Sequence, residues 1–190
     1  MTKNILLVGV GGQGTILASK ILTLGLLQEG YDVKMSEIHG MSQRGGSVVT
    51  HVRYSKDEVF SPVIEMGSAD LIVAFEKMEA LRYLPFLKPN GKIVVNDYEI
   101  PGSPITSGAV EYPKGIIEEI KAHSNATIIE ANVEAEKLGN TKVMNIVLLG
   151  AIIGQMQLTD INWDIILEEN VKPKFVEANK LALKRGIELA

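Results

Sequence analysis

A glycine-rich turn, Gly9-Val-Gly-Gly-Gln-Gly14, directly follows the apolar run from Asn4 to Val10. An apolar run with no polar alternation is typical of a strand that is covered on both faces in a parallel sheet. From Gln13 to Glu29, apolar residues recur with helical periodicity, and Gly30 supplies a stop signal. The chain therefore begins with a contiguous strand, turn and helix, which is the first unit of an α/β fold.

The rest of the chain continues this alternation and then becomes helical. Predicted strands cover 33–38, 47–54, 69–75, 92–97, a short segment after 108, and 127–130, whereas predicted helices cover 77–87, 115–124, 132–138, 144–156, 162–171 and 173–189. The pattern predicts a doubly wound, mostly parallel sheet with helices on both faces, a Rossmann-like variant with a β-strand inserted after strand two and a helical C-terminus. A length of 190 residues suits one core, so we expect residues 1–190 to form a single domain.

The composition excludes several classes of function. A formal net charge of −4 lacks the positive field that sequence-independent nucleic-acid binding needs, so we expect no nucleic-acid partner. The sequence has no cysteine, which excludes disulfides, thiolate-bound zinc and a cysteine-bound iron–sulfur cluster in this chain. The most apolar stretch, 143–156, is shorter than the roughly 20 residues that cross a bilayer. With no secretion signal visible, we expect a cytoplasmic protein that does not enter a membrane.

The glycine turn is the first candidate binding site, and its residues are Gly9, Gly11, Gly12, Gln13 and Gly14. Its unpaired amides and the dipole of the following helix favour a phosphate or a carboxylate. The spacing also matches the dinucleotide fingerprint, in which Glu37 would bind the ribose. In a NAD-binding fold the second strand would continue into a crossover helix, whereas in this sequence it continues into a loop and another strand. The other interpretation is a turn that packs a strand against a helix without any ligand.

The loop 39–46 is the second candidate site, because it follows a strand end where ligands gather in open α/β sheets. Its candidate residues are Ser42, Gln43, Arg44, Gly45 and Gly46. Arg44 can clamp a phosphate or carboxylate through two hydrogen bonds, and the glycines allow a backbone to approach closely. The same composition suits a loop buried in a subunit interface, and the sequence leaves both interpretations open.

The remaining polar residues indicate no catalytic machinery. His51 and His123 have no second histidine at a ligand spacing, so we expect no metal site. Glu76 is expected to cap the helix that follows it, and Asn145 to tie a neighbouring loop or backbone. Because no nucleophile–base pair or pair of carboxylates emerges, we assign no catalytic residue and expect the chain to be inactive alone.

Four motifs occur in an order that is typical of one known family. They are the glycine turn 9–14, the loop His39-Gly-Met-Ser-Gln-Arg-Gly-Gly46, Ser68-Ala-Asp-Leu71 and Val95-Asn-Asp97. Together they resemble the gamma domain of 2-oxoacid:ferredoxin oxidoreductases. Within that family the chain resembles in particular the beta subunits of indolepyruvate ferredoxin oxidoreductases, through the segments Tyr83-Leu-Pro-Phe-Leu-Lys-Pro89, Glu111-Tyr-Pro113 and Gly139-Asn-Thr-Lys-Val-Met-Asn-Ile-Val-Leu-Leu-Gly150.

The resemblance covers nearly the whole chain and implies a subunit of an oxidoreductase. Such an enzyme oxidatively decarboxylates a 2-oxoacid, here indolepyruvate or another aryl pyruvate, forms an acyl-coenzyme A and passes electrons to ferredoxin. Thiamine diphosphate, Mg²⁺ and [4Fe–4S] clusters would belong to a larger partner subunit, and coenzyme A would be the cosubstrate. This chain, which would hold no cofactor firmly, would support the active site at the subunit interface or bind coenzyme A through Gly11, Gly12, Gly14 and Arg44.

Several alternatives stay open at this point. Gamma subunits of pyruvate, 2-oxoisovalerate and 2-oxoglutarate ferredoxin oxidoreductases share the same domain. A free-standing NAD(P)-dependent dehydrogenase and a nucleotide-binding module are the alternatives of another class. Apolar surface that is meant for a partner also favours a homodimer of the isolated chain.

Overall fold

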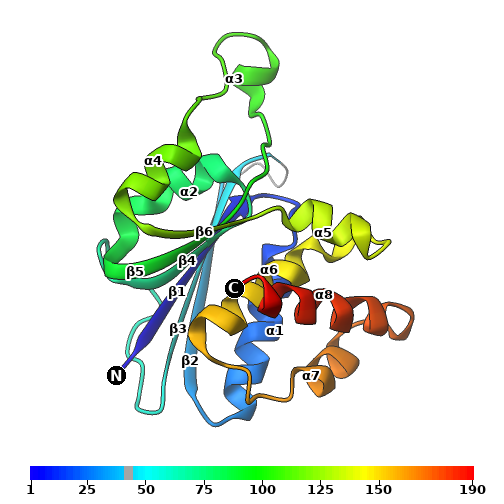
Figure 1. Cartoon of the computed structure of the whole chain (residues 1–190). Coiled ribbons are helices and arrows are strands. Elements are labelled where there is room, and N and C mark those ends of the chain that lie inside the picture. Colours follow the sequence, from blue (N-terminus) through cyan, green and yellow to red (C-terminus); the bar gives the residue numbers. More distant parts are fainter. Residues whose placement is uncertain (41–44) are drawn as a thin grey trace.

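The computed structural model describes residues 1–40 and 45–190 and contains a six-stranded sheet with helices on both faces (Figure 1). The strands are β1 (Lys3–Val10), β2 (Asp32–His39), β3 (Ser47–Ser55), β4 (Ala69–Ala74), β5 (Leu87–Asn96) and β6 (Asn125–Ile129). The α-helices are α1 (Thr15–Gln28), α2 (Lys77–Tyr83), α3 (Ser103–Thr106), α4 (Ile116–His123), α5 (Ala131–Lys137), α6 (Met144–Met156), α7 (Trp163–Asn170) and α8 (Val176–Glu188). Short 3-10 helices are η1 (Leu84–Phe86), η2 (Thr141–Val143) and η3 (Pro173–Phe175).

The strand order β2-β3-β1-β4-β5-β6 confirms the predicted fold class. The strands β1, β4, β5 and β6 are mutually parallel, as expected for strands joined by helical crossovers. Strand β3 lies antiparallel between β1 and β2, with Ile5 and Met35 both opposite Val52. Residues 40–46 alone connect β2 to β3, and so short a connection can join antiparallel strands but not parallel ones.

Two local predictions differ from the structure. The segment 88–91, left between the predicted helix 77–87 and the predicted strand 92–97, lies within β5 as an irregularity in its pairing with β4, and Asn90 there has a φ of 63°. The short strand predicted after residue 108 is wrong, because residues 108–114 form turns and irregular backbone. They pair with none of the six strands of the sheet.

Two hydrophobic cores fill the space between the sheet and its helices. The larger core lies against α1, α6, α7 and α8, and the smaller one against α2 and α4 on the other face (Figure 1). Helix α6 is buried at every residue from Met144 to Ile153, which confirms the predicted buried helix. Within the described ranges, the helices are too short or too polar to cross a membrane.

Glycines allow α6 and α8 to pack with their backbones in contact. A Cβ atom added to Gly186 would lie 1.9 Å from the carbonyl oxygen of Val147, and one added to Gly150 would lie 2.2 Å from that of Leu183. At Gly154 the nearest atom is instead a side-chain atom, the Cβ of Ala190, at 2.5 Å. The first two positions therefore have no room for any side chain, because backbone atoms border them, whereas a methyl group borders the third.

His51 is a buried histidine with a structural hydrogen bond. It lies in β3 with 3% exposure, and its Nδ1 accepts a hydrogen bond of 3.1 Å from the backbone amide of Ile64. Burial lowers the pKa of His51, because the charged imidazolium is poorly solvated there. The side chain thus joins β3 to the connection that leads to β4.

We predict that Gly186→Ala lowers the free energy of unfolding by about 1–3 kcal/mol, because the added methyl group forces two helix backbones apart. Denaturant titration followed by circular dichroism measures the loss. Gly154→Ala is the matched control and should cost clearly less, since Ala190 can move. Equal losses for the two variants would contradict the close packing of α6 on α8.

Stability should also depend on pH through His51. The pKa of this histidine is about 6.5 in the unfolded chain and lower in the native protein. As the pH falls through the range between these two pKa values, the unfolded state binds more protons than the native state. We therefore expect the free energy of unfolding to fall from pH 7 to pH 5, with a contribution from this group of at most about 1.4 kcal/mol per pH unit. His51→Asn, whose Oδ1 can accept the same hydrogen bond, should flatten this dependence.

Candidate functional site

The glycine turn lies where β1 ends and α1 begins. Gly12 and Gly14 have φ angles of 103° and 83°, a left-handed conformation that glycine adopts without steric cost. Gly14 is the N-cap of α1 and provides no side-chain oxygen, so the first amides of the helix are not capped by a side chain. The amides of Gly11 and Gln13 donate to the carbonyls of Gly46 and Val10, so the turn presents its other backbone N–H groups and the positive end of the α1 dipole.

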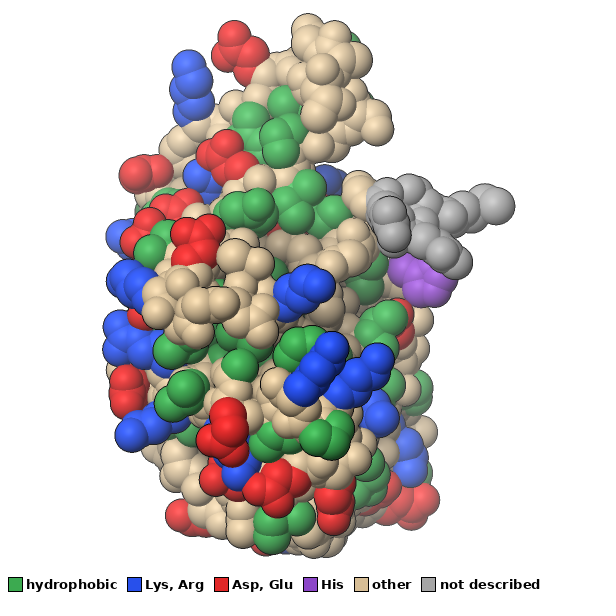
Figure 2. All heavy atoms as spheres, turned by 90° about the vertical axis from the view of Figure 1, so that its right-hand side faces the viewer, with side chains coloured by type: hydrophobic (Ala, Val, Ile, Leu, Met, Phe, Trp, Pro, Cys, Tyr) green, Lys and Arg blue, Asp and Glu red, His purple; other side chains and the backbone are tan. Residues whose placement is uncertain are grey.

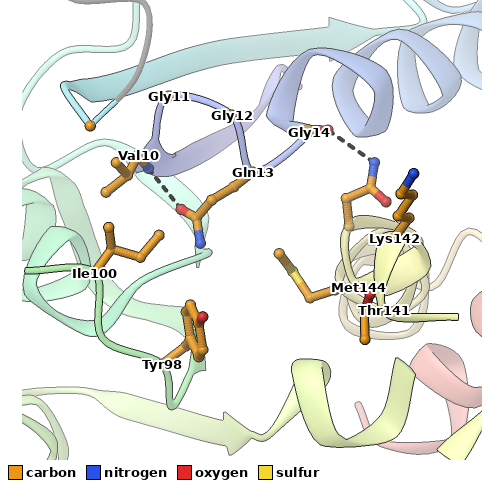
Figure 3. A pocket seen from close by; sticks show the side chains of 12 residues that line it. Val10, Gly11, Gly12, Gln13, Gly14, Tyr98, Ile100, Thr141, Lys142 and Met144 are labelled. Carbon is orange, nitrogen blue, oxygen red and sulfur yellow. Dashed lines mark hydrogen bonds between the residues drawn. The ribbon is translucent and has the colours of Figure 1, made fainter. Parts of the chain in front are cut away.

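Gln13 holds this turn against the neighbouring strand. Its Oε1 accepts a hydrogen bond of 2.7 Å from the Val10 amide (Figure 3). Its Nε2 donates one of 2.8 Å to the Phe75 carbonyl. A Cβ on Gly9 would lie 2.8 Å from that Oε1, so the glycine makes room for the amide. Both polar ends of Gln13 are thus engaged within the chain, and its side chain supports the turn.

Buried amides continue this connection across the carboxyl ends of the parallel strands. Phe75, at the end of β4, also accepts a hydrogen bond of 3.0 Å from Asn96 Nδ2 at the end of β5. Asn96 Oδ1 in turn accepts one of 2.9 Å from the Ala131 amide, which begins α5 after β6. Gln13 and Asn96, which we call the amide row, thereby fix the ends of β1, β4, β5 and β6 relative to one another.

A cavity of about 650 Å³ opens in front of the turn (Figure 3). Its lining comes from three parts of the chain and comprises Val10, Gly11, Gly12, Gln13, Gly14, Gly45, Tyr98, Ile100, Thr141, Lys142, Met144 and Asn145. The N-terminal ends of α1 and α6 both border it, and among its described lining residues Lys142 carries the sole charge. The cavity is therefore electropositive and suited to an anionic group.

Asn145 ties α6 to the turn, which confirms its predicted role. Its Nδ2 donates a hydrogen bond of 3.2 Å to the carbonyl of Gly14 (Figure 3). A Cβ on Gly14 would lie 2.6 Å from that nitrogen, so this glycine is needed for space as well as for its backbone conformation. The buried Oδ1 of Asn145 has no hydrogen-bond partner among the residues that the structure describes.

Glu37 lies near the turn but in an arrangement that differs from a dinucleotide site. It lines a second cavity of about 400 Å³ together with Gly12, Ile16 and His39, and its Oε2 accepts a weak hydrogen bond of 3.4 Å from Thr50. Strand β3 separates β2 from β1, whereas a dinucleotide-binding half places its second strand beside the first. The topology therefore argues against NAD binding, in agreement with the missing crossover helix.

The described end of the 39–46 loop lies against the glycine turn. The amide of Gly11 donates a hydrogen bond of 2.9 Å to the carbonyl of Gly46, and Gly45 lines the larger cavity. Ser42, Gln43 and Arg44 lie outside the described residues. The structure thus brings together the glycine turn and the glycine end of the 39–46 loop at one cavity.

The cavity residues from η2 and α6 were missed as binding residues. Thr141 and Lys142 lie far from the glycine turn in the sequence. The one sequence feature that pointed to them was the segment 139–150, which contributed to the family resemblance.

Glu76 caps α2 as predicted, with its Oε2 accepting a hydrogen bond of 3.0 Å from the Glu79 amide. In the described part of the chain, no group of three or more His, Asp or Glu side chains is arranged to hold a metal ion.

Comparisons with known proteins place this geometry in context. The family model described as Pyruvate ferredoxin/flavodoxin oxidoreductase matches residues 4–189. Indolepyruvate oxidoreductase subunit IorB of Archaeoglobus fulgidus is 38% identical over 191 residues, covering 98% of this chain and 94% of the relative. The corresponding subunit of Pyrococcus horikoshii is 36% identical over 194 residues, with 98% and 95% covered.

Solved structures show the same fold. The gamma subunit of a keto/oxoacid ferredoxin oxidoreductase from Geobacter sulfurreducens has a TM-score of 0.73 and 24% identity, covering 99% of this chain and 98% of that chain. A 2-oxoglutarate:ferredoxin oxidoreductase from Magnetococcus marinus has a TM-score of 0.75 and 20% identity, covering all of this chain (100%) but 31% of that one. The same fold therefore occurs both as a separate chain and as part of a longer one.

We predict that Gln13→Glu lowers the free energy of unfolding by about 2–3 kcal/mol, because it replaces the buried donor to the Phe75 carbonyl with an oxygen. Thermal and denaturant unfolding measure the effect. The control is Gln28→Glu, at the exposed C-terminal end of α1, which should change stability by less than about 0.5 kcal/mol. A Gln13→Glu variant as stable as the control would show that the amide row does not hold the turn.

Proposed function

Because the chain belongs to the pyruvate ferredoxin/flavodoxin oxidoreductase family, we propose that it is the small subunit of an aryl-pyruvate ferredoxin oxidoreductase whose substrate is indolepyruvate. The similarity to IorB subunits over nearly the full length carries this proposal. The complex would break the bond between the carboxyl and keto carbons of the 2-oxoacid. It would release CO₂, transfer the acyl group to the coenzyme A thiol and pass two electrons to ferredoxin.

We assign the redox and decarboxylation cofactors to a larger partner subunit. A cysteine-free chain cannot bind an iron–sulfur cluster through thiolates, so [4Fe–4S] clusters do not fit this subunit. Thiamine diphosphate and Mg²⁺ would likewise reside in the partner, which would carry the chemistry. The isolated small subunit would then be inactive and pair with itself, and the assembled enzyme would work in the cytoplasm.

The small subunit would act at the interface with that partner. The electropositive cavity between α1 and α6 supports a role in binding an anionic group, and the phosphates of coenzyme A are the anions of the proposed reaction. The second version of the role is structural, with the 39–46 loop buried against the partner. The two versions differ in what Arg44 contacts.

The first test is copurification with the native larger subunit. Coexpression should yield a brown complex that reduces ferredoxin with an aryl pyruvate and coenzyme A. A colourless protein that binds no partner and oxidises its substrate with NAD would overturn the proposal.

The assembled enzyme then distinguishes the two versions of the role. If the loop binds coenzyme A, we predict that Arg44→Ala raises the KM for coenzyme A about 10–100-fold, the value of one charge-assisted hydrogen bond, with assembly unchanged. Lys142→Ala should act in the same direction, because its ammonium borders the cavity that Gly45 also lines. Lys121→Ala, on α4 and remote from that cavity, is the control. Weaker assembly with an unchanged KM would instead support the structural version.

A further inference from the structure

A segment without charged side chains projects from the body of the protein. It comprises residues 100–110, with the sequence Ile-Pro-Gly-Ser-Pro-Ile-Thr-Ser-Gly-Ala-Val, in a chain of which 22% is charged. Helix α3 lies at the end of this projection (Figure 1). Figure 2 shows the projection as mostly tan and green, whereas blue and red side chains are spread over the body. We call residues 100–110 the arm.

Hydrogen bonds within the arm give it a defined shape. The Gly102 carbonyl accepts bonds of 3.0 Å from the amides of Ile105 and Thr106, and the Pro104 carbonyl accepts bonds from those of Ala109 and Val110. Prolines at 101 and 104 fix two further backbone angles. A segment that is ordered in advance loses less conformational entropy when it binds.

One buried carboxylate anchors both ends of the arm. Glu76, with 1% exposure, accepts a hydrogen bond of 3.3 Å from the Ile100 amide and another from the Tyr112 hydroxyl, both at its Oε1. Burial and the nearby Glu76 raise the pKa of Tyr112, so its hydroxyl stays protonated and can donate. A buried carboxylate is tolerated only where donors satisfy it, so this anchor constrains the geometry of the arm.

The arm lies beside the candidate site. Tyr98 and Ile100, at its first end, line the larger cavity on the side opposite Lys142 (Figure 3). A subunit that covers this cavity would therefore meet the arm.

We propose that the arm is a preformed docking element that inserts into an uncharged groove of the larger subunit, and this inference rests on the proposed function. An uncharged arm can be buried without the desolvation penalty of an ion. Its exposed apolar and hydroxyl groups match a groove lined by apolar side chains and backbone polar groups. Glu76 acts as a positioning residue, since it fixes the direction in which the arm leaves the body.

The test compares two charge insertions at equally exposed apolar residues. Val110 is 54% exposed in the arm, and Leu181 is 55% exposed on α8. Each is changed to Glu in the complex coexpressed with the larger subunit, and dissociation on dilution is followed by mass photometry. We expect V110E to raise the Kd of the complex at least about tenfold, because a charge would enter the groove, and L181E to change it less than about twofold.

Three outcomes separate the possible failures. If the wild-type chain forms no complex with the larger subunit, the proposed function fails. If the wild-type complex forms and V110E binds equally well, the docking arm is wrong while the proposed function stands. If V110E instead dissociates only a self-dimer of the isolated chain, a second copy is the occupant and the proposal is overturned.

A second variant tests the anchor without altering the surface of the arm. Tyr112→Phe removes one hydrogen bond to Glu76 and keeps the ring. We expect faster amide hydrogen exchange at residues 101–110 in the isolated chain and a Kd for the larger subunit raised several-fold. Unchanged exchange and an unchanged Kd would show that Glu76 does not position the arm.

Discussion

The arrangement of the site depends on the amide row at the carboxyl ends of the parallel strands. Gln13 and Asn96 both donate to the carbonyl of Phe75, one from the turn after β1 and the other from β5. Buried amides of this kind are costly unless they are fully paired, so their bonds leave few alternative positions for the strand ends. The glycine backbone of the turn can stay uncovered and open to a ligand, because the hydrogen bonds of the Gln13 side chain to Val10 and Phe75 hold its shape.

Helix α6 is the second fixed wall of the cavity. Its first turn is tied to Gly14 by Asn145, and its middle packs against α8 through Gly150 and Gly186. The helix is thus held at its first turn and at its middle, and its N-terminus and that of α1 border one cavity. An anion in that space would be bound by rigid backbone groups, and Lys142 would add a charge at the rim.

The sequence predicted those parts of the fold that local patterns determine. The first strand, turn and helix follow from residues 4–29 alone, and the inserted strand follows from the lack of a helical pattern before residue 47. Its antiparallel direction is known from the structure alone. The role of Gln13 was not predictable in this way, since its contact with Phe75 joins residues 62 positions apart. A polar residue among glycines has the same local pattern whether it binds a ligand or braces a turn. The short strand expected after residue 108 failed for a related reason, because a strand also needs a neighbour that local sequence does not specify.

The position of β3 also limits how this scaffold can diversify. Neighbouring strands are spaced about 4.8 Å apart, so one inserted strand places β2 about twice that distance from β1. A carboxylate on β2 is displaced by a full strand width from the place where a dinucleotide-binding fold needs it. No single substitution restores that distance. Recruitment of this fold to nicotinamide chemistry would require the deletion of a whole strand and the gain of a crossover helix, a change of topology that point mutations cannot reach.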